Sequence, residues 1–418
     1  MNKLNKLERH WVMYDVANSA FVLLATTIIP IYFKNLASAD GVANYDSTAY
    51  VSYASAIVTL AVAILGPTIG TIADTRGFKK PIFTVFLLMG CIGCVLMPTM
   101  PNWLAFLVVF IFAKIGMSSS IILNDSMLVD VTKPERMDML SSKGYAWGYI
   151  GSCVPFVISL VLILQAESIG LTATTATMIA FMLTAVWWFL FSLPILKSYK
   201  QLHYVEKEEH AIRKSFVRLG NFAKTIKHKK KIYLFLFAFF FYIDGVYTII
   251  NLATSYGKDV GITDSNLLLA LLLTQVVAFP CALIFGRLST RFRPEQIIKV
   301  CIIGYFCITV FALQLDKTWE FWLLAVAVAV FQGAIQAMSR SYYAKIIPKH
   351  ESSEYFGFYD IFGKGATFFG SMVMGISTQL FSTSRAGVAA LALMFPIGYY
   401  LLTRSEKAEE IVYDEKIN

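Results

Sequence analysis

The sequence has few of the residues that most enzyme and metal sites need. It holds five histidines and six cysteines in 418 residues, and only 15% of its residues are charged. Cys91 and Cys94 have the spacing of metal ligands, but they lie in an apolar segment with no second pair and no histidine beside them. All six cysteines fall in apolar segments, which argues against a disulfide framework. We therefore expect neither a metal site nor a cofactor.

Nucleotide-binding loops are also missing. The stretch GFYDIFGKG is similar to one, but it has one residue too many between Gly357 and Gly363 and no serine or threonine after Lys364. Clusters of histidine or aspartate that could serve an enzyme near a membrane face are absent too. These absences exclude an ATP-driven pump that works without a partner subunit, and they argue against an enzyme.

The sequence is rich in long apolar segments. Apolar residues make up 57% of the chain and the mean hydropathy is +0.62, which is unlike an ordinary soluble domain. A bilayer core needs about 20 apolar residues per helix, and unbroken runs of that length favour helices over a transmembrane barrel. We predict an all-α membrane protein with about twelve transmembrane helices. The predicted spans are 11–36, 47–73, 81–99, 102–130, 140–165, 173–196, 232–256, 264–287, 296–315, 319–347, 354–381 and 385–403.

Basic residues sort to one side of these spans. Of the 36 lysines and arginines, 29 fall in the N-terminal tail, in the loops after even-numbered spans and after the last span, and four fall in the other loops. Since cytoplasmic loops carry such an excess, both termini are expected in the cytoplasm. The net charge of +9 is then a topology signal, which argues against nucleic-acid binding. An uncleaved N-terminus, short loops and no organelle signal favour a bacterial plasma membrane.

A basic stretch at residues 197–231 divides the chain nearly in half. It holds eleven basic and three acidic residues, so we expect a cytoplasmic linker that lies on anionic lipid. Its lysine cluster directly precedes a span, which is typical of a topology anchor rather than of a nucleic-acid site. The predicted domains are a first bundle at 1–196, this linker, a second bundle at 232–403 and a cytoplasmic tail at 404–418.

The two halves share an internal repeat. Gly70 and the charges that follow it recur at Gly286, 216 residues later. The segment GMSSSIILNDSMLVDV, which starts at Gly116, has its counterpart at Gly333, 217 residues later. Repeats of this kind indicate two pseudo-symmetric six-helix bundles.

The first copy of the repeat resembles a motif of the major facilitator superfamily. Members carry a glycine, an aspartate, a glycine and a basic cluster between their second and third helices. The matching residues here are Gly70, Asp74, Arg76, Gly77, Lys79 and Lys80. Thr75 and Phe78 stand where basic residues are common, and the second copy has Thr290 in place of the aspartate.

Three further segments resemble the UMF1 family of that superfamily, which includes fungal vacuolar amino-acid effluxers. They are YDVANSAF, GAIQAMSRSYYAKIIP and EYFGFYDIFGKGATFFG, spread over both halves. The resemblance implies a secondary transporter that exports a small solute with proton coupling, and we expect it to act as a monomer. A receptor or scaffold that does not transport, or a lipid translocator, stays open as an alternative.

The motif loop has a physical reading of its own. Glycines let a short turn pack against a neighbouring helix, while Asp74 can accept hydrogen bonds from a helix N-terminus or pair with a cation. We expect Gly70, Asp74, Arg76 and Gly77 to latch the two halves together at the cytoplasmic side. A solvated turn whose basic residues only set topology is the alternative.

Two ionisable residues fall near the middle of their spans. Asp244 and Lys114 each lie about 18 Å into a helix and belong to different halves. The superfamily resemblance implies that both helices line a central cavity, so the two charges could form a pair that a proton or the solute breaks. Asp244 would then carry the proton. A permanent structural ion pair, or a lysine that extends elsewhere, is the alternative.

Polar side chains near that level are candidates for solute binding. They are Gln332, Gln336, Asn251 and Tyr247, which suit a polar solute, together with Lys364. Polar side chains also join transmembrane helices to one another, and Asp360 could pair with Lys364 four residues away.

A second polar layer lies nearer the cytoplasmic ends. Its members are Asp15, Asn18, Asn124, Asp125, Asp130, Arg340 and Asp360. One arginine among several carboxylates indicates a cytoplasmic gate that closes when the cavity opens outward, although simple anchoring at the interface also explains residues such as Asp15.

Overall fold

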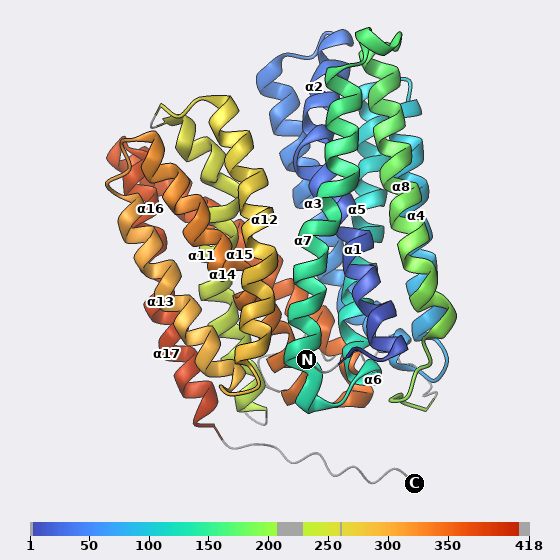
Figure 1. Cartoon of the computed structure of the whole chain (residues 1–418), viewed down its shortest axis with the longest axis vertical. Coiled ribbons are helices and arrows are strands. Elements are labelled where there is room, and N and C mark those ends of the chain that lie inside the picture. The colour runs from blue at the N-terminus through green and yellow to red at the C-terminus, as the bar shows by residue number, and fades with distance from the viewer. Residues whose placement is uncertain (1–2, 207–228, 260, 409–418) are drawn as a thin grey trace.

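The computed structural model describes residues 3–206, 229–259 and 261–408, and in these ranges the regular secondary structure is helical, with one isolated bridge between Thr75 and Val205. Helices α1 to α8 form one group and α11 to α17 the other (Figure 1). The helices are α1 (Lys6–Thr26), α2 (Ile28–Ala39), α3 (Asn44–Asp74), α4 (Lys79–Leu96), α5 (Trp103–Ser126), α6 (Leu128–Val131), α7 (Pro134–Leu164), α8 (Ala173–Ser198), α11 (Lys230–Asp259), α12 (Asp264–Leu288), α13 (Pro294–Ala312), α14 (Thr318–Ile346), α15 (Ser352–Phe381), α16 (Ser384–Ala392) and α17 (Met394–Glu406).

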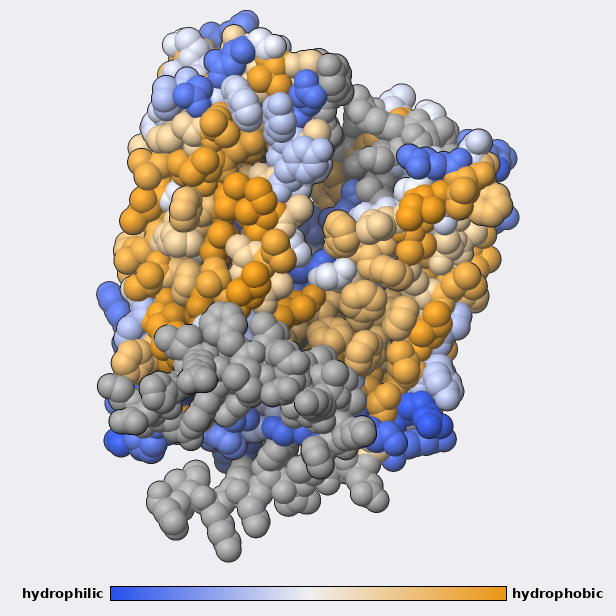
Figure 2. All heavy atoms as spheres, turned by 180° about the vertical axis from the view of Figure 1, so that it is seen from behind, coloured by the Kyte–Doolittle hydropathy of each residue, from blue (hydrophilic) through white to orange (hydrophobic). Residues whose placement is uncertain are grey.

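The helices are long and apolar enough for a multi-pass membrane protein. Eleven helical stretches in the described residues could each cross a bilayer, and α15, with 30 residues, is a further long helix. This helix is more polar because it carries Glu354, Asp360 and Lys364, and it packs between α3, α5 and α11. Figure 2 shows apolar side chains over the outer surface of both halves. The predicted all-α membrane fold is confirmed.

Prolines interrupt two of the predicted spans. Helix α1 ends at Thr26, four residues before Pro30, and α16 ends at Ala392, four residues before Pro396. A proline has no N–H for the carbonyl four residues earlier, and its ring crowds that carbonyl. The first and last predicted spans are therefore each built from two helices, α1 with α2 and α16 with α17.

The two halves meet through a pseudo-symmetric pair of helix contacts. Helix α3 of the first half packs against α15, and α12 of the second half packs against α7. Gly66 and Gly357 bring the α3 and α15 backbones together, since a Cβ on Gly357 would lie 2.6 Å from the Gly66 carbonyl carbon. In the second contact a Cβ on Gly286 would lie 2.7 Å from Cβ of Ser142. The domain boundaries stay predictions, because most of the predicted linker lies outside the described residues.

The molecule is closed at one end and hollow at the other. The start of α1 and the end of α17 lie at the same end, which we call the terminal face (Figure 1). Away from that face, Figure 2 shows a hollow between the two halves with hydrophilic atoms along it. The residues that close the terminal face and those at mid-height are therefore the natural place to look for a site.

Candidate functional site

Asp74 joins the two halves at the terminal face. It ends α3, and its carboxylate oxygens accept hydrogen bonds from the backbone N–H groups of Ser353 (3.0 Å) and Glu354 (2.9 Å) at the start of α15. A helix N-terminus offers unpaired N–H groups and a partial positive charge to such a carboxylate. Gly70, one turn earlier, allows the close approach, because a Cβ there would lie 2.4 Å from the Ser353 carbonyl oxygen.

Lys79 is buried beside Asp74. Its ammonium lies 3.4 Å from the Asp74 carboxylate and 3.9 Å from the Asp130 carboxylate. It also donates a hydrogen bond to the hydroxyl of Ser352 on the other half (2.9 Å). One buried cation thus compensates two buried carboxylates, which would be costly without it.

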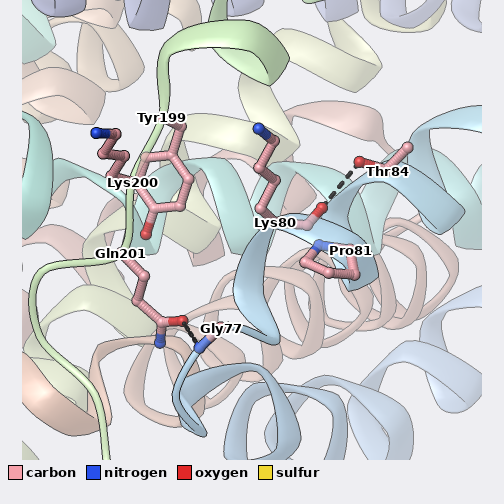
Figure 3. Close-up of a pocket in the computed structure, with 7 residues that line it drawn as sticks. All are labelled: Gly77, Lys80, Pro81, Thr84, Tyr199, Lys200 and Gln201. Atoms are coloured by element: carbon pink, nitrogen blue, oxygen red, sulfur yellow. Dashed lines mark hydrogen bonds between the residues drawn. The ribbon is translucent and has the colours of Figure 1, made fainter.

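The segment after α8 supports the same contact from the side. His203 lies 2.8 Å from the Asp130 carboxylate through its ring Nδ1 and also donates its backbone N–H (3.0 Å). The side-chain oxygen of Gln201 accepts a hydrogen bond from the Gly77 N–H (2.9 Å), and Figure 3 shows this contact at a pocket that Lys80 and Lys200 also line. Gly77 has a φ of +80°, a conformation that favours glycine.

Arg76 behaves differently from the rest of the motif. Among the described residues it forms one ion pair, with Glu206 at 3.4 Å, and both side chains are largely exposed. Exposed pairs of this kind contribute about 1 kcal/mol or less. In this conformation Arg76 belongs to the loop surface and makes none of the contacts between halves that we find in the described residues.

Arg340 is the centre of a second contact between the halves. From α14 it forms ion pairs with Asp15 (3.0 Å) and Asp125 (2.8 Å) of the first half. It also donates hydrogen bonds to the hydroxyl (2.9 Å) and the carbonyl (3.1 Å) of Ser141. Gly144 leaves room for this arrangement, since a Cβ there would lie 1.9 Å from a carboxylate oxygen of Asp15.

Four members of the predicted gate layer do not join Arg340. Asp130 lies beside Lys79, and Asp360 accepts a hydrogen bond from Lys364, one turn further along α15 (2.6 Å). The Asn18 amide donates to the Tyr14 carbonyl of its own helix (3.1 Å), and the Asn124 side chain is buried without a hydrogen-bond partner among the described residues. The sequence placed these residues at the right height, but height alone does not fix which way a side chain points.

Further polar contacts between the halves follow the same side of the molecule. They are Lys345 with Asp138 (2.6 Å), Ser126 with Ser353 (2.9 Å) and the Gln336 amide with the Tyr149 hydroxyl (3.3 Å). Gln336 is ten residues from the end of α14, about 15 Å above the terminal face. In the described ranges, every hydrogen bond and ion pair that we find between the halves lies between that face and about mid-height.

Two lysines lie at mid-height on opposite halves. Lys114 of α5 is twelve residues from the end of its helix and Lys364 of α15 is twelve residues from its start, about 18 Å from the terminal face in both cases. Helices α5 and α15 pack together, so the two lysines lie at the same level on neighbouring helices. Lys364 forms an ion pair with Asp360, whereas Lys114 lies over the ring of Phe110 at 5.3 Å.

Asp244 is not paired with Lys114. Its side chain is fully buried inside the second half, where one oxygen accepts hydrogen bonds from the Gly370 N–H (3.0 Å) and the Thr248 hydroxyl (3.2 Å). Its other oxygen has no hydrogen-bond partner within the part of the chain that the structure describes. Gly370 of α15 makes the space, because a Cβ there would lie 2.1 Å from the carboxylate. This arrangement corrects the expectation that the two charges face each other.

The remaining predicted solute-binding residues are spread over α11 and α14. Gln332 is buried, and its carbonyl accepts a hydrogen bond from the Gln336 amide (3.1 Å). Tyr247 is half-buried and its ring lies near Gly363 of α15, while Asn251 is exposed. The structure therefore joins Gln332 and Gln336 to each other but brings neither Tyr247 nor Asn251 into the contacts between the halves that we find in the described residues.

Sequence reasoning missed several residues at the closed end. Lys79 was assigned to a topology-setting cluster, although its place between Asp74 and the next apolar span could have suggested a buried cation. Asp138 was assigned to a loop because the fifth span was expected to begin at residue 140, and α7 begins at Pro134. Ser141, Ser352 and the other hydroxyls gave no signal.

Comparison with known proteins assigns the fold and the family. Residues 5–136 and 129–410 match the family described as Vacuole effluxer Atg22 like. The protein called Uncharacterized MFS-type transporter YxiO from Bacillus subtilis is 43% identical over 407 residues, which cover 96% of this chain and 95% of that protein. Autophagy-related protein 22-1 from Aspergillus niger is 26% identical over 301 residues, 65% of this chain and 48% of the relative. The chain thus spans about half the length of this fungal relative.

Solved structures share the architecture at low sequence identity. The human organic anion transporter MFSD10 superimposes with a TM-score of 0.72 at 13% identity and covers 95% of this chain and 98% of its own. The Major Facilitator Superfamily transporter FucP, in its outward conformation, gives a TM-score of 0.69 at 13% identity and covers 96% and 98%. At these identities the likeness shows the fold alone.

Proposed function

The chain belongs to the vacuole effluxer Atg22-like family of the major facilitator superfamily and is a transporter rather than an enzyme, and we propose that it exports a small polar solute with proton coupling. Amino acids or similar metabolites are the solute class that its resemblance to fungal vacuolar effluxers suggests. Transport would proceed by alternating access, in which the two halves rock about a shared site.

One observation carries this proposal. The polar contacts that join the halves in the described residues lie on the terminal side, and the hollow lies on the other side (Figure 2). Asp74 and Arg340 would then form the gate that is closed in this conformation and that breaks when the site opens to the terminal side. Contacts of a few kcal/mol are sufficient to bias such an equilibrium strongly.

The terminal face would lie in the cytoplasm. Its loops carry most of the basic residues, and positive charge is retained on the cytoplasmic side of membrane proteins. We place the protein in a bacterial plasma membrane as a monomer, with the hollow open to the outside in this conformation.

Asp244 is the proposed proton carrier. It is a fully buried carboxylate at mid-height with one oxygen that lacks a hydrogen-bond partner. Keeping a carboxylate ionised inside a membrane costs free energy, so the buried Asp244 side chain can gain a proton there and lose it when water reaches it. The Asp244→Asn variant should lose transport driven by a pH gradient and keep exchange of solute at equal pH.

Counterflow in liposomes tests the whole proposal. The purified full chain would first be screened by thermal shift against amino acids, peptides, sugars and nucleosides, and each hit would then be tested for counterflow and proton flux. A matched control is Asp316→Asn, an exposed carboxylate. Binding without counterflow would indicate a receptor and contradict the proposal, as would movement of lipid alone.

A further inference from the structure

The charges at mid-height are out of balance. Lys114 and Lys364 bring two ammonium groups to the same level from opposite halves, as α5 and α15 pack together. Asp360, one turn before Lys364, is held by that lysine at 2.6 Å. Lys114 has no carboxylate within 4.0 Å in the described part of the chain, only the face of the Phe110 ring.

The other buried carboxylates are engaged elsewhere. Asp125 pairs with Arg340, and it lies eleven residues from Lys114 on the same helix, about 16 Å away along the axis. Asp15 pairs with the same arginine. Asp244 is turned into its own half and bonds to Gly370 and Thr248. None of these three forms an ion pair with Lys114 in the described residues.

An ammonium inside a membrane protein needs an opposite charge or water, because burial in a low dielectric is costly. An anion placed between Lys114 and Lys364 would supply that charge and relieve the repulsion between them. A carboxylate suits this role, since charge-assisted hydrogen bonds from two ammonium groups fit its two oxygens. Among the described residues, Asp360 is already occupied by Lys364 and Asp244 is turned into its own half, so neither is placed to pair with a solute ammonium.

We propose that the transported solute is bound through a carboxylate by Lys114 and Lys364, and that an amino group on the solute is not required. This inference rests on the proposed transport function and narrows its substrate class to small organic carboxylates. Because the two lysines belong to different halves, the bound carboxylate bridges them and favours their approach at mid-height.

The test uses matched compounds that differ only in charge. For alanine and for phenylalanine, the free amino acid, the N-acetyl acid, the amino-acid amide and the N-acetyl amide are compared by thermal shift and by binding to the purified full chain. In each set, the free amino acid and the N-acetyl acid are expected to bind, whereas the amino-acid amide and the N-acetyl amide are not expected to bind. Lys114→Gln should weaken binding of the acids about tenfold or more, which is the loss expected for one charge-assisted contact.

Control variants separate charge from folding. Lys114→Arg keeps the charge and should stay within a few-fold of the wild type, and Lys34→Gln removes an exposed lysine and should bind normally. Lys364→Gln alone would leave Asp360 without its ion-pair partner. The double variant that combines Lys364→Gln with Asp360→Asn is therefore used instead of the single variant. Amides that bind as well as acids, no binding of any acid, or full affinity in Lys114→Gln would each overturn the inference. The proposed transport function fails separately, if counterflow is absent with every solute class, sugars and nucleosides included.

Discussion

Replacing Gly70 with alanine is expected to push the two halves apart at the terminal face. The new Cβ would lie 2.4 Å from the Ser353 carbonyl oxygen and 2.6 Å from the Glu354 nitrogen. Both are backbone atoms at the start of α15, so the contact cannot be relieved by turning a side chain. Ordinary contact needs about 3.5 Å, so α3 and α15 must separate by about 1 Å.

The free-energy cost follows from the contacts that this separation disturbs. Overpacking at a close helix contact costs about 1–3 kcal/mol. The same movement lengthens the bonds from Ser353 and Glu354 to the Asp74 carboxylate, and bonds to a charged group contribute about 1.5–3 kcal/mol. The two free-energy costs overlap, because both describe the same contact between α3 and α15. A loss of about 2–3 kcal/mol shifts the equilibrium away from the closed terminal face by about 30-fold to 150-fold.

Distances between spin labels on Lys200 and Lys407, one on each half, measure this shift in a background without native cysteines. Gly70→Ala should populate a longer distance, and Gly375→Ala on α15 should not, because a Cβ there meets nothing within 4 Å. Gly286→Ala, at the pseudo-symmetric contact, should act in the same direction as Gly70→Ala, since its Cβ would lie 2.7 Å from Ser142. An unchanged distance in a stable Gly70→Ala protein would falsify the assignment of this contact as a latch.

Other variants address the remaining contacts. Arg340→Ala leaves Asp15 and Asp125 buried without their cation, so transport should stall or leak rather than show only a raised KM, and unchanged kinetics in a folded variant would contradict this. Asp74→Asn keeps one acceptor but removes the charge opposite Lys79, so the spin-label distance should shift less than in Gly70→Ala; a larger shift would show that charge outweighs packing. Gly370→Ala would place a Cβ 2.1 Å from the Asp244 carboxylate and should alter the pH dependence of transport while leaving counterflow measurable; an unchanged pH profile would remove Asp244 from proton coupling.

The fold could be predicted from the sequence because hydropathy and charge act over whole segments. A run of about 20 apolar residues is best accommodated as a membrane-spanning helix, and the charge of a loop indicates the side of the membrane on which that loop lies. The helix breaks were harder to predict. Pro30 and Pro396 each remove the bond to the last residue of the helix before them, but Pro67, Pro155 and Pro280 lie inside continuous helices. Helix α15 was identified as a span even though its hydropathy is lowered by Asp360 and Lys364.

The site could be predicted only in part, because a sequence fixes the height of a residue in the membrane better than the direction of its side chain. Asp244 and Lys114 lie at similar heights, but Asp244 points toward Gly370 within its own half. The partners of Asp74 were easier to predict, because Asp74 ends a helix in a glycine-rich turn where few partners other than a helix N-terminus or a cation fit. Arg340 has a long side chain that reaches several carboxylates, so the prediction of its ion pairs depended less on the exact rotation of its helix.

Helix α15 makes contacts at three levels, and their distribution constrains how a proton could act. Its first turn bonds to Asp74, and Lys364, at the level of Lys114 on α5, lies about 16 Å higher. The bond to Asp74 joins the two halves and the two lysines belong to different halves, so a rocking movement must change both arrangements. The contact of Gly370 with Asp244 lies inside the second half, and a rigid movement leaves it intact. A proton on Asp244 can therefore influence the closed face by changing how α15 sits on α11, and a helix bonded along its length transmits that change to its first turn.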